Sequence, residues 1–516
     1  MNINMVATKL PKIIPPYKLS ILNLHFSKLL TSPIHSNLST SSSSLVYNNN
    51  AKFKFSNTIC ACALGTPKIL SENQETEVEE FQEKFDWYAE WYPVVHVCDL
   101  DDSGPLRRRV MGFDIVVWWE SDKVEKDWKV FEDKPKDAPL QDHDSKKASV
   151  AVYPSCVQND IRWFWPDTDP QYEGILLEKR PPEIPEIASL PASKLNYSRD
   201  LPYGYEVLIQ NLMDPAHIPY LSLQYTVKAD KEGGKPLEMN VKELSINGFK
   251  AKLEFEGSVG TFSPPCLFYI SMNYTKTPIG HSNDVQSSHD TQKRYLMILY
   301  CIPVSPGYSR LIVTTRRNFA LWLDPVVPLW IFHQELNLVL DSDLYLIHME
   351  ERKLMNVGPL NWHKSCYVPT KADAVVVSFR RWLIKFGGGQ VQWGAKFMEV
   401  LPPTPPREQF FDRYWTHTMN CKSCRLAYKM LNALEILLQV TSIAVIGMMF
   451  AAFNNNMISM AARSGAVSLS VIFFIASKWL SVLAYKTFRY HDYNHASIKA
   501  HPFSFIIQQL QSYVGL

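Results

Sequence analysis

Two cysteines stand three positions apart near the end of the chain, in the stretch Cys421-Lys-Ser-Cys424. This spacing suits either a redox dithiol or half of a zinc site. Zinc would need two further ligands, and His417 is the nearby residue that could offer one. Because Lys422 and Arg425 would favour the thiolate form, we expect a redox pair. The alternative to a redox or metal-binding role is a pair of reduced thiols that lies next to the apolar, membrane-like segment described below.

The remaining cysteines are scattered, and most of the nine in the chain have no close cysteine neighbour. This is not a disulfide framework, and it suits a reducing compartment. The net charge of +2 gives no reason to expect a polyanionic partner such as nucleic acid. The length of 516 residues allows two or three domains once a targeting segment is removed.

The first 71 residues contain no Asp or Glu, while they carry seven lysines and a hydroxyl-rich run from Ser36 to Ser44. A basic, hydroxyl-rich and acid-free N-terminus is typical of an organelle transit peptide. Lysine in place of arginine, together with the serine tract, favours the chloroplast. We expect cleavage near residues 60–63, so that residues 1–62 form the transit peptide. The alternative is a disordered basic tail.

Two apolar runs near the other end, residues 436–453 and 466–484, each approach the roughly 20 residues that cross a bilayer. Three asparagines at 454–456 would form the turn between them, although Lys478 interrupts the second run. The pattern predicts a transmembrane hairpin over 436–484; the alternative is a buried hairpin. By the positive-inside rule both flanks face one side, which in a chloroplast is the stroma. The flanking cations are Lys422, Arg425, Lys429, Lys486 and Arg489.

The segment 85–166 is rich in strand patterns and in tryptophans, which we expect to pack in the core. Strand character appears at residues 110–120, 128–131, 148–153 and 161–165, and the polar stretch 132–147 is expected to be a loop.

The segment 201–411 combines strand patterns with two helical ones, so we predict an antiparallel sheet packed against helices and an α+β fold class. The expected strands are 205–209, 250–255, 267–272, 295–302 and 309–316. One helix is expected to begin near Asn211 and the other to span about 328–354, and residues 227–236 should form a solvent loop.

Several phrases in a fixed order together resemble one family, the chloroplast Rieske non-haem iron oxygenases that include pheophorbide a oxygenase and the protochlorophyllide-dependent translocon component. The resemblance extends from about Phe85 to His495 and leans toward the translocon component through the ending YHDYNHA. The other phrases are FDWYAEWYPVVHVCDLD, VMGFDIVVWW, WKVFEDK, SKKASVAVYPSCVQNDIRWFWP, PYGYEVLIQNLMDPAHIPY, DSDLYLIH and HTMNCKSCRLAY.

The resemblance implies a Rieske domain that holds a [2Fe–2S] cluster through Cys-x-His and Cys-x-x-His, and a second domain that holds Fe(II) through two His and one carboxylate. Electrons from a donor such as ferredoxin would pass from cluster to iron, and activated oxygen would attack a chlorophyll-type tetrapyrrole. It further implies a membrane location in the inner envelope or thylakoid, a thioredoxin-responsive Cys421–Cys424 pair and a homo-oligomer.

The cluster ligands that the resemblance implies are missing. None of the nine cysteines is followed by His at the second or third position. By resemblance, a block of roughly forty to fifty residues that holds both halves of the motif is absent between Lys134 and the SKKA phrase. We therefore expect residues 85–166 to form a truncated Rieske-type domain. We also expect strands 110–119 and 148–153 to lose sheet partners.

The iron site is also incomplete. The resemblance makes His217 one iron ligand and places the second His at Ser222, whose hydroxyl is a poor substitute for imidazole. Asp343 matches the carboxylate ligand best, with Asp341 as the alternative, and Asp214 would link the two metal centres. His348 is a further candidate for the missing imidazole.

Three hypotheses follow from these residues: an oxygenase relative whose activity is lost, a non-enzymatic membrane component that binds a porphyrin or belongs to a translocon, and an active oxygenase whose cluster block is missing from this sequence alone. An omitted exon, an alternative transcript and a true deletion all agree with the sharp break after Lys134. The tetrapyrrole and the choice of membrane stay open.

Overall fold

The computed structural model describes residues 83–101, 104–121, 126–133, 151–190, 195–215, 237–253, 258–274, 293–394, 400–452 and 459–493. The expected transit peptide, most of the loop 132–147, the loop 227–236, the turn at 454–456, His217 and Ser222 lie outside these residues.

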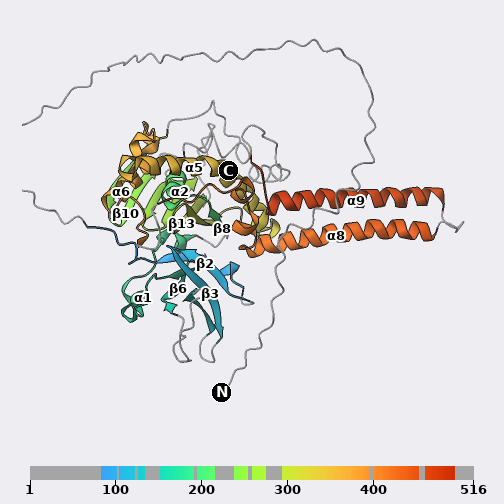
Figure 1. The fold of residues 1–516 in the computed structure, drawn as a ribbon, viewed down its shortest axis with the longest axis horizontal. Helices are drawn as coiled ribbons and strands as arrows, with labels where there is room; N and C mark the ends of the chain where they lie inside the picture. Colours follow the sequence, from blue (N-terminus) through green and yellow to red (C-terminus); the bar gives the residue numbers. More distant parts are fainter. Residues whose placement is uncertain are drawn as a thin grey trace, which may run out of the picture. The chain divides into compact units, whose positions relative to one another are not determined.

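The β-rich segment expected at 85–166 contains two small antiparallel sheets (Figure 1). The order of the first is β1-β7-β6 and that of the second is β2-β3-β4-β5. A two-residue turn, Met111-Gly112, joins β2 to β3 with positive φ angles of 50° and 77°, as a type I′ hairpin requires. The strands are β1 (Tyr92–His96), β2 (Leu106–Val110), β3 (Phe113–Ser121), β4 (Lys126–Glu132), β5 (Val152–Tyr153), β6 (Ser155–Gln158) and β7 (Ile161–Phe164).

The second small sheet is continuous across the expected break. Strand β3 pairs with β2 on one side and with β4 on the other. Strand β5 pairs with β4 through Val130–Tyr153 and Phe131–Val152 and forms the edge of the sheet. The expectation that β3 lacks a partner is therefore wrong, because β4 fills that place directly.

The next part of the chain forms a seven-stranded antiparallel sheet in the order β8-β14-β13-β12-β11-β10-β9. The strands β12, β13 and β14 contain the expected stretches 267–272, 295–302 and 309–316. Pro306-Gly307, with Gly307 at a φ of 74°, turns the chain between β13 and β14, as a Pro-Gly type II turn does. The strands are β8 (Leu195–Leu201), β9 (Met239–Ser245), β10 (Gly248–Leu253), β11 (Val259–Ser263), β12 (Leu267–Tyr274), β13 (Lys293–Ser305) and β14 (Tyr308–Arg317).

Helices α2, α5 and α6 pack on this sheet, so the α+β fold class is confirmed (Figure 1). The long helix α5 (Leu329–Val357) begins after Pro328 and ends before Gly358, close to the expected 328–354. Helix α6 (Ala374–Lys385) contacts β9 and β10. Short helical turns connect these elements: η2 (Val97–Asp99), η3 (Pro170–Tyr172), α1 (Ile175–Glu178), η4 (Pro185–Ser189), α4 (Leu323–Val326), η5 (Pro359–Lys364), η6 (Lys371–Asp373) and α7 (Arg407–Phe410).

The strand expected at 205–209 is wrong, since these residues begin helix α2 (Tyr205–Leu212). The helix expected to begin near Asn211 in fact ends there. Tyr205, Val207, Leu208 and Ile209 are all buried, because α2 contacts both β13 and α5. A short apolar run such as Val207-Leu208-Ile209 occurs both in buried strands and in buried helices, so periodicity did not separate the two.

Aromatic side chains join the start of the described chain to the large sheet. The ring of Trp87 packs edge-on against Tyr205 and Trp382, and its indole N–H donates to the Gly387 carbonyl at 3.1 Å. Trp87 and Trp382 are both fully buried. The expectation of core packing is confirmed for Trp87 and Trp91, which are buried, but it is wrong for Trp118, whose side chain is 51% exposed.

Two long apolar helices end the described chain, α8 (Lys422–Ala451) and α9 (Met460–Phe488), which run side by side (Figure 1). Each is long and apolar enough to cross a membrane, with a mean hydropathy of 1.9 over its most apolar window. Their apolar side chains are largely exposed, as those of Ile443, Phe450 and Ile475 illustrate. Between the helices, the hydroxyls of Ser442 and Ser470 lie 3.0 Å apart and each donates to the other's carbonyl at 2.9 Å.

Candidate functional site

Helix α5 carries a buried carboxylate, Asp341, held between two arginines. One carboxylate oxygen accepts from Arg199 at 2.6 Å, and the other accepts from Arg413 at 2.6 and 2.9 Å. All three side chains are at most 1% exposed. Both oxygens of Asp341 are therefore occupied by guanidinium groups, so the alternative iron ligand from the sequence already has a different role.

Asp343 lies two positions further along α5, on a different face of the helix. Its side chain is buried, and one carboxylate oxygen accepts from the Ser342 hydroxyl at 3.1 Å. Burial and, to a smaller extent, the negative charge of Asp343 raise the pKa of Tyr203, which places that phenol near the carboxylate. The role of Asp343 as a metal-binding carboxylate stays a prediction.

The other iron-site residues give a partial picture. Asp214 follows the end of α2, is half-buried and donates its backbone N–H to the Asn211 carbonyl at 3.2 Å. His217 and Ser222 fall in the segment 216–236, outside the described residues. The described part of the chain therefore holds Asp214 and Asp343 but shows no donor set around them.

His348 does not replace the missing imidazole, because both of its ring nitrogens have partners. Nδ1 contacts the Pro202 carbonyl at 2.6 Å, and Nε2 accepts from Arg352 at 3.0 Å and contacts the Thr404 hydroxyl at 2.9 Å. Burial lowers the pKa of His348, so the neutral ring is favoured. Its contacts hold the loop before α2 and the segment around Thr404 against α5.

The cysteine pair lies at the base of the apolar helices, where Cys421 directly precedes α8 and Cys424 lies in its first turn. Both thiols are buried, and two buried histidines stand beside them, His333 from α5 and His417 from the π-helical turn η8 (Tyr414–Thr418). Sequence spacing had pointed to His417. It gave no sign of His333, which stands 91 positions before Cys424.

Electrostatics at this cluster favour a thiolate at Cys421 and a neutral imidazole at His417. A hydrogen bond from Cys424, together with His333 and His417, lowers the pKa of Cys421 to about 2, although burial opposes the shift. Burial lowers the pKa of His417 to about 3. Thiolate and neutral imidazole are the forms in which these side chains bind metals.

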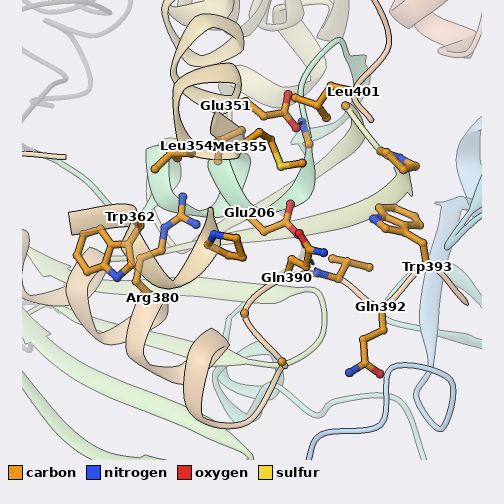
Figure 2. A pocket seen from close by; sticks show the side chains of 18 of the residues that line it. Glu206, Glu351, Leu354, Met355, Trp362, Arg380, Gln390, Gln392, Trp393 and Leu401 are labelled. Carbon is orange, nitrogen blue, oxygen red and sulfur yellow. Dashed lines mark hydrogen bonds between the residues drawn. The ribbon is translucent and has the colours of Figure 1, made fainter. Parts of the chain in front are cut away.

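A cavity of 310 Å³ opens where α2, α5, α6 and the segment 387–394 meet (Figure 2). Figure 2 shows Trp362 and Arg380 on one side of it and Trp393 on the other. The carboxyl of Glu351 accepts from the Gly204 N–H at 2.9 Å, and that of Glu206 accepts from the Val391 N–H at 2.8 Å. Asp343 is not among the lining residues, so this cavity is separate from the expected iron position.

Burial and the neighbouring Glu206 charge raise the pKa of Glu351 to about 8, so its carboxyl is largely protonated at neutral pH. The two carboxyls at the cavity thus serve to fix backbone N–H groups. The lining residues offer neither a nucleophile with its base nor a set of metal ligands.

Comparison with known proteins relates the chain to chloroplast enzymes and translocon proteins. The sequence model of the pheophorbide a oxygenase family matches residues 262–360. Protochlorophyllide-dependent translocon component 52 of Arabidopsis thaliana is 43% identical, over 82% of this chain and 88% of the relative. Flavonoid 8-hydroxylase 2 of Ocimum basilicum is 44% identical, over 85% and 90%.

A third relative, pheophorbide a oxygenase of Oryza sativa, is 29% identical, over 70% of this chain and 77% of its own length. The names of all three relatives describe them as chloroplastic. Identity of this level over nearly the full length of the first relatives shows common descent. The chain belongs to the chloroplast Rieske-type oxygenase family of pheophorbide a oxygenase and the protochlorophyllide-dependent translocon component.

Proposed function

We propose that the chain is a chloroplast member of this family that retains the oxygenase scaffold and a membrane anchor but, with this sequence, has lost the oxygenase reaction. One observation carries the proposal: none of the nine cysteines is followed by His two or three positions later. A Rieske cluster needs two thiolates and two imidazoles, and its motif supplies them at those spacings.

The sequence of the region where the cluster motif belongs does not contain these ligands. Strands β4 and β5 pair directly, and the segment 134–150 between them contains one histidine, His143, and no cysteine. Among the described residues, one group of His, Cys or acidic side chains is close enough together to bind a metal ion. This group lies at the base of α8 and not in the β-rich segment. The residues of the β-rich segment therefore do not fit a [2Fe–2S] cluster.

The mononuclear iron is expected to bind poorly. Two imidazoles and a carboxylate form the site in this family type, and the position of the second imidazole is Ser222. Asp343 and His217 would be left as two ligands. Without the cluster, an electron donor such as ferredoxin would have no route to an iron even if one were bound.

The decisive experiment uses the full chain, purified in detergent and treated with iron and sulfide under reducing conditions. We expect neither the electron paramagnetic resonance signal of a reduced Rieske cluster nor oxygen consumption with a tetrapyrrole. A relative that retains both Cys-His motifs, treated in the same way, provides the positive control. A Rieske signal from this chain would overturn the proposal.

For the ligand, we propose a chlorophyll-type tetrapyrrole such as protochlorophyllide or a pheophorbide. The matching family is described as pheophorbide a oxygenase, and the Arabidopsis thaliana relative reported above is named for protochlorophyllide. The chain would then act as a membrane-bound porphyrin binder or a translocon-associated component. We expect protochlorophyllide to quench tryptophan fluorescence of the purified chain saturably, and a linear, non-saturating response would exclude this role.

A flavonoid is the second candidate ligand, favoured by the relative named as a flavonoid hydroxylase, which is equally similar. The same titration with a flavone separates the two ligand classes. Saturable flavone binding without protochlorophyllide binding would assign the chain to the flavonoid branch.

Transcript sequencing tests whether the loss belongs to the protein. A transcript that encodes Cys-x-His and Cys-x-x-His between Lys134 and Ser145 would restore an active oxygenase, and the present chain would be a shorter product of the same gene. A transcript that encodes the present sequence and nothing longer would support lost activity.

We further propose that residues 1–62 direct the chain to the chloroplast and that 436–484 anchor it in the inner envelope or thylakoid, with the folded part in the stroma. The chloroplastic relatives and the two apolar helices support this. Protease treatment of intact and lysed organelles provides the test, since stromal exposure predicts digestion after lysis alone. Homo-oligomerisation can be tested by cross-linking the same material.

A further inference from the structure

We propose that Cys421, Cys424, His333 and His417 form a tetrahedral Zn²⁺ site that fastens the base of the apolar hairpin to helix α5. This proposal stands apart from the oxygenase chemistry and uses none of the expected iron residues. Its ligands come from three places: α5, the π-helical turn η8 and the start of α8. All four side chains are buried, at 3% exposure or less.

The distances between the donor atoms are those of a single coordination shell. His333 Nδ1 lies 3.3 Å from Cys424 Sγ and 3.5 Å from Cys421 Sγ, and His417 Nε2 lies 3.2 Å from Cys424 Sγ. All four donors lie within 4.8 Å of one another. A zinc ion with usual Zn–S and Zn–N bonds in a tetrahedron separates sulfur from nitrogen by about 3.5 Å.

The local structure aims one histidine ring at the sulfurs. The Nδ1–H of His417 donates to the Ser198 carbonyl at 2.7 Å, which leaves the lone pair on Nε2 directed at Cys424. This is the second-shell contact that usually orients a metal-binding histidine. The ring also stacks on Tyr197, whose hydroxyl is held by Asn337. Short π-helical segments such as η8 are frequent at functional sites.

Zinc suits these donors better than a [2Fe–2S] cluster, although both accept two Cys and two His. In a Rieske cluster the cysteines bind one iron and the histidines bind the other, which keeps the sulfur pair apart from the nitrogen pair. Here each histidine nitrogen contacts a sulfur. Two thiolates and two imidazoles around one ion are a standard structural zinc set.

Burial also distinguishes the site from an exposed redox switch. A thioredoxin-responsive pair must present a sulfur to its partner, whereas Cys421 and Cys424 are 3% and 0% exposed. The thiols are not joined by a disulfide. Zinc binding would release the proton of Cys424, because the ligand form of cysteine is the thiolate.

The first test is metal analysis of the full chain, purified in detergent without added chelator. We expect about one zinc ion per chain. Each of the variants C421S, H333Q and H417Q removes a proposed ligand. Each should lower the affinity for zinc by more than the roughly 10–100-fold that is lost when a residue outside the ligand shell is changed. The control is C156S, which alters a half-buried thiol in β6 and should keep its zinc.

A second test needs no substituted protein, so it holds even if a ligand variant does not fold. Wild-type chain is alkylated before and after treatment with a strong chelator, and the modified cysteines are located by mass spectrometry. Cys421 and Cys424 should react only after chelation, while the exposed Cys98 should react in both samples. Replacement by Co²⁺ should add the visible absorption of a tetrahedral thiolate complex.

Three outcomes would overturn the proposal. One is a folded chain that contains no zinc and binds none when Zn²⁺ is added. Another is a disulfide between Cys421 and Cys424 in the purified chain. The third is the absorption and electron paramagnetic resonance of an iron–sulfur cluster that disappears in C421S.

Discussion

Asp341 and Asp343 stand two residues apart on helix α5, yet their surroundings differ completely. Asp341 faces the base of the apolar hairpin and forms ion pairs with Arg199 and Arg413 on both of its oxygens. Asp343 is buried on another face of the helix and accepts from the hydroxyl of the neighbouring Ser342. One face of the helix carries a buried ion-pair network, and the other carries the carboxylate that we predict for the iron, whose second imidazole we expect to be missing at Ser222.

The difference puts the buried ion-pair network and the expected iron carboxylate on separate faces of one helix. The hairpin face brings together α5, η8 and the two apolar helices through buried charges and the His–Cys cluster. Apart from Asp341, the alternative carboxylate, none of these contacts involves an expected iron ligand. A chain of this fold could therefore lose oxygenase chemistry while the contacts between the large sheet and the apolar hairpin stay intact.

The largest expected effect comes from breaking the hairpin face with D341N. The substitution leaves two buried guanidinium groups without their carboxylate, and loss of one partner of a buried ion pair costs about 3–5 kcal/mol. Thermal unfolding followed by circular dichroism in detergent would measure the loss. D114N is the matched control, because it breaks an exposed ion pair with Arg109 that is worth about 0–1 kcal/mol. Equal stability of the two variants would show that the buried network does not hold this face together.

Repair of the opposite face is the second way to test the comparison. The substitution S222H restores the second imidazole. Because a residue outside the ligand shell already changes metal affinity by roughly 10-fold, this added ligand should raise the Fe(II) affinity by more than that. Calorimetric titration with Fe(II) under anaerobic conditions provides the measurement. In the double variant S222H/D343N the gain should disappear. A gain that persists in the double variant would remove Asp343 from the ligand set.

A smaller effect is expected at the cavity end of α5. The pKa of Glu351 is raised from 4.5 to about 8, so between these pH values the folded chain keeps a proton that the unfolded chain has released. Stability should therefore fall as pH rises through this window. E351Q removes the titration and should be more stable than wild type at pH 8 by on the order of 1–3 kcal/mol.

Denaturant unfolding at pH 5 and pH 8 would measure this change, with E178Q on the exposed surface of α1 as the control. The same pH dependence in wild type and E351Q would contradict the assignment of the shift to Glu351.

The smallest effect concerns the contact between the two apolar helices. Ser442 and Ser470 exchange hydrogen bonds in the buried seam, and such bonds between membrane helices are worth about 0.6 kcal/mol on average. A double-mutant cycle with S442A and S470A, measured by unfolding in detergent, should give a coupling of this size. T441V is the control, because the Thr441 hydroxyl bonds within its own helix to Leu437. Zero coupling would indicate that packing alone holds the helices together.

Much of the fold could be predicted from the sequence, because β12, β13, β14 and α5 are long enough for their periodicity to be clear. Helix α2 was not predicted, because its buried run Val207-Leu208-Ile209 resembles a short strand and its polar face consists of little more than Glu206 and Gln210. The pairing of β4 with β5 was not predicted either. The segment between these strands lacks the cluster motif, and the sequence alone did not show which strands would pair across it.

The metal cluster illustrates the same limit. The CxxC pair and His417 lie within eight residues of one another, so sequence spacing indicates them at once. His333 reaches the cluster only because α5 packs against the start of α8, and linear spacing carries no signal of that packing. Ligand sets assembled from distant elements need the tertiary fold before they can be recognised.

The acceptors around the Arg413 guanidinium have a consequence for the order in which the protein matures. Besides Asp341, this group donates to the carbonyls of Lys486 and Thr487, at the far end of α9. The Thr418 hydroxyl donates to the Phe488 carbonyl in the same place. Helix α9 follows both the large sheet and α5 in the chain, so these contacts cannot form until α9 has been translated. The core around α5 therefore closes only after the end of the second apolar helix has packed back against it, which makes the hairpin a precondition of the finished fold.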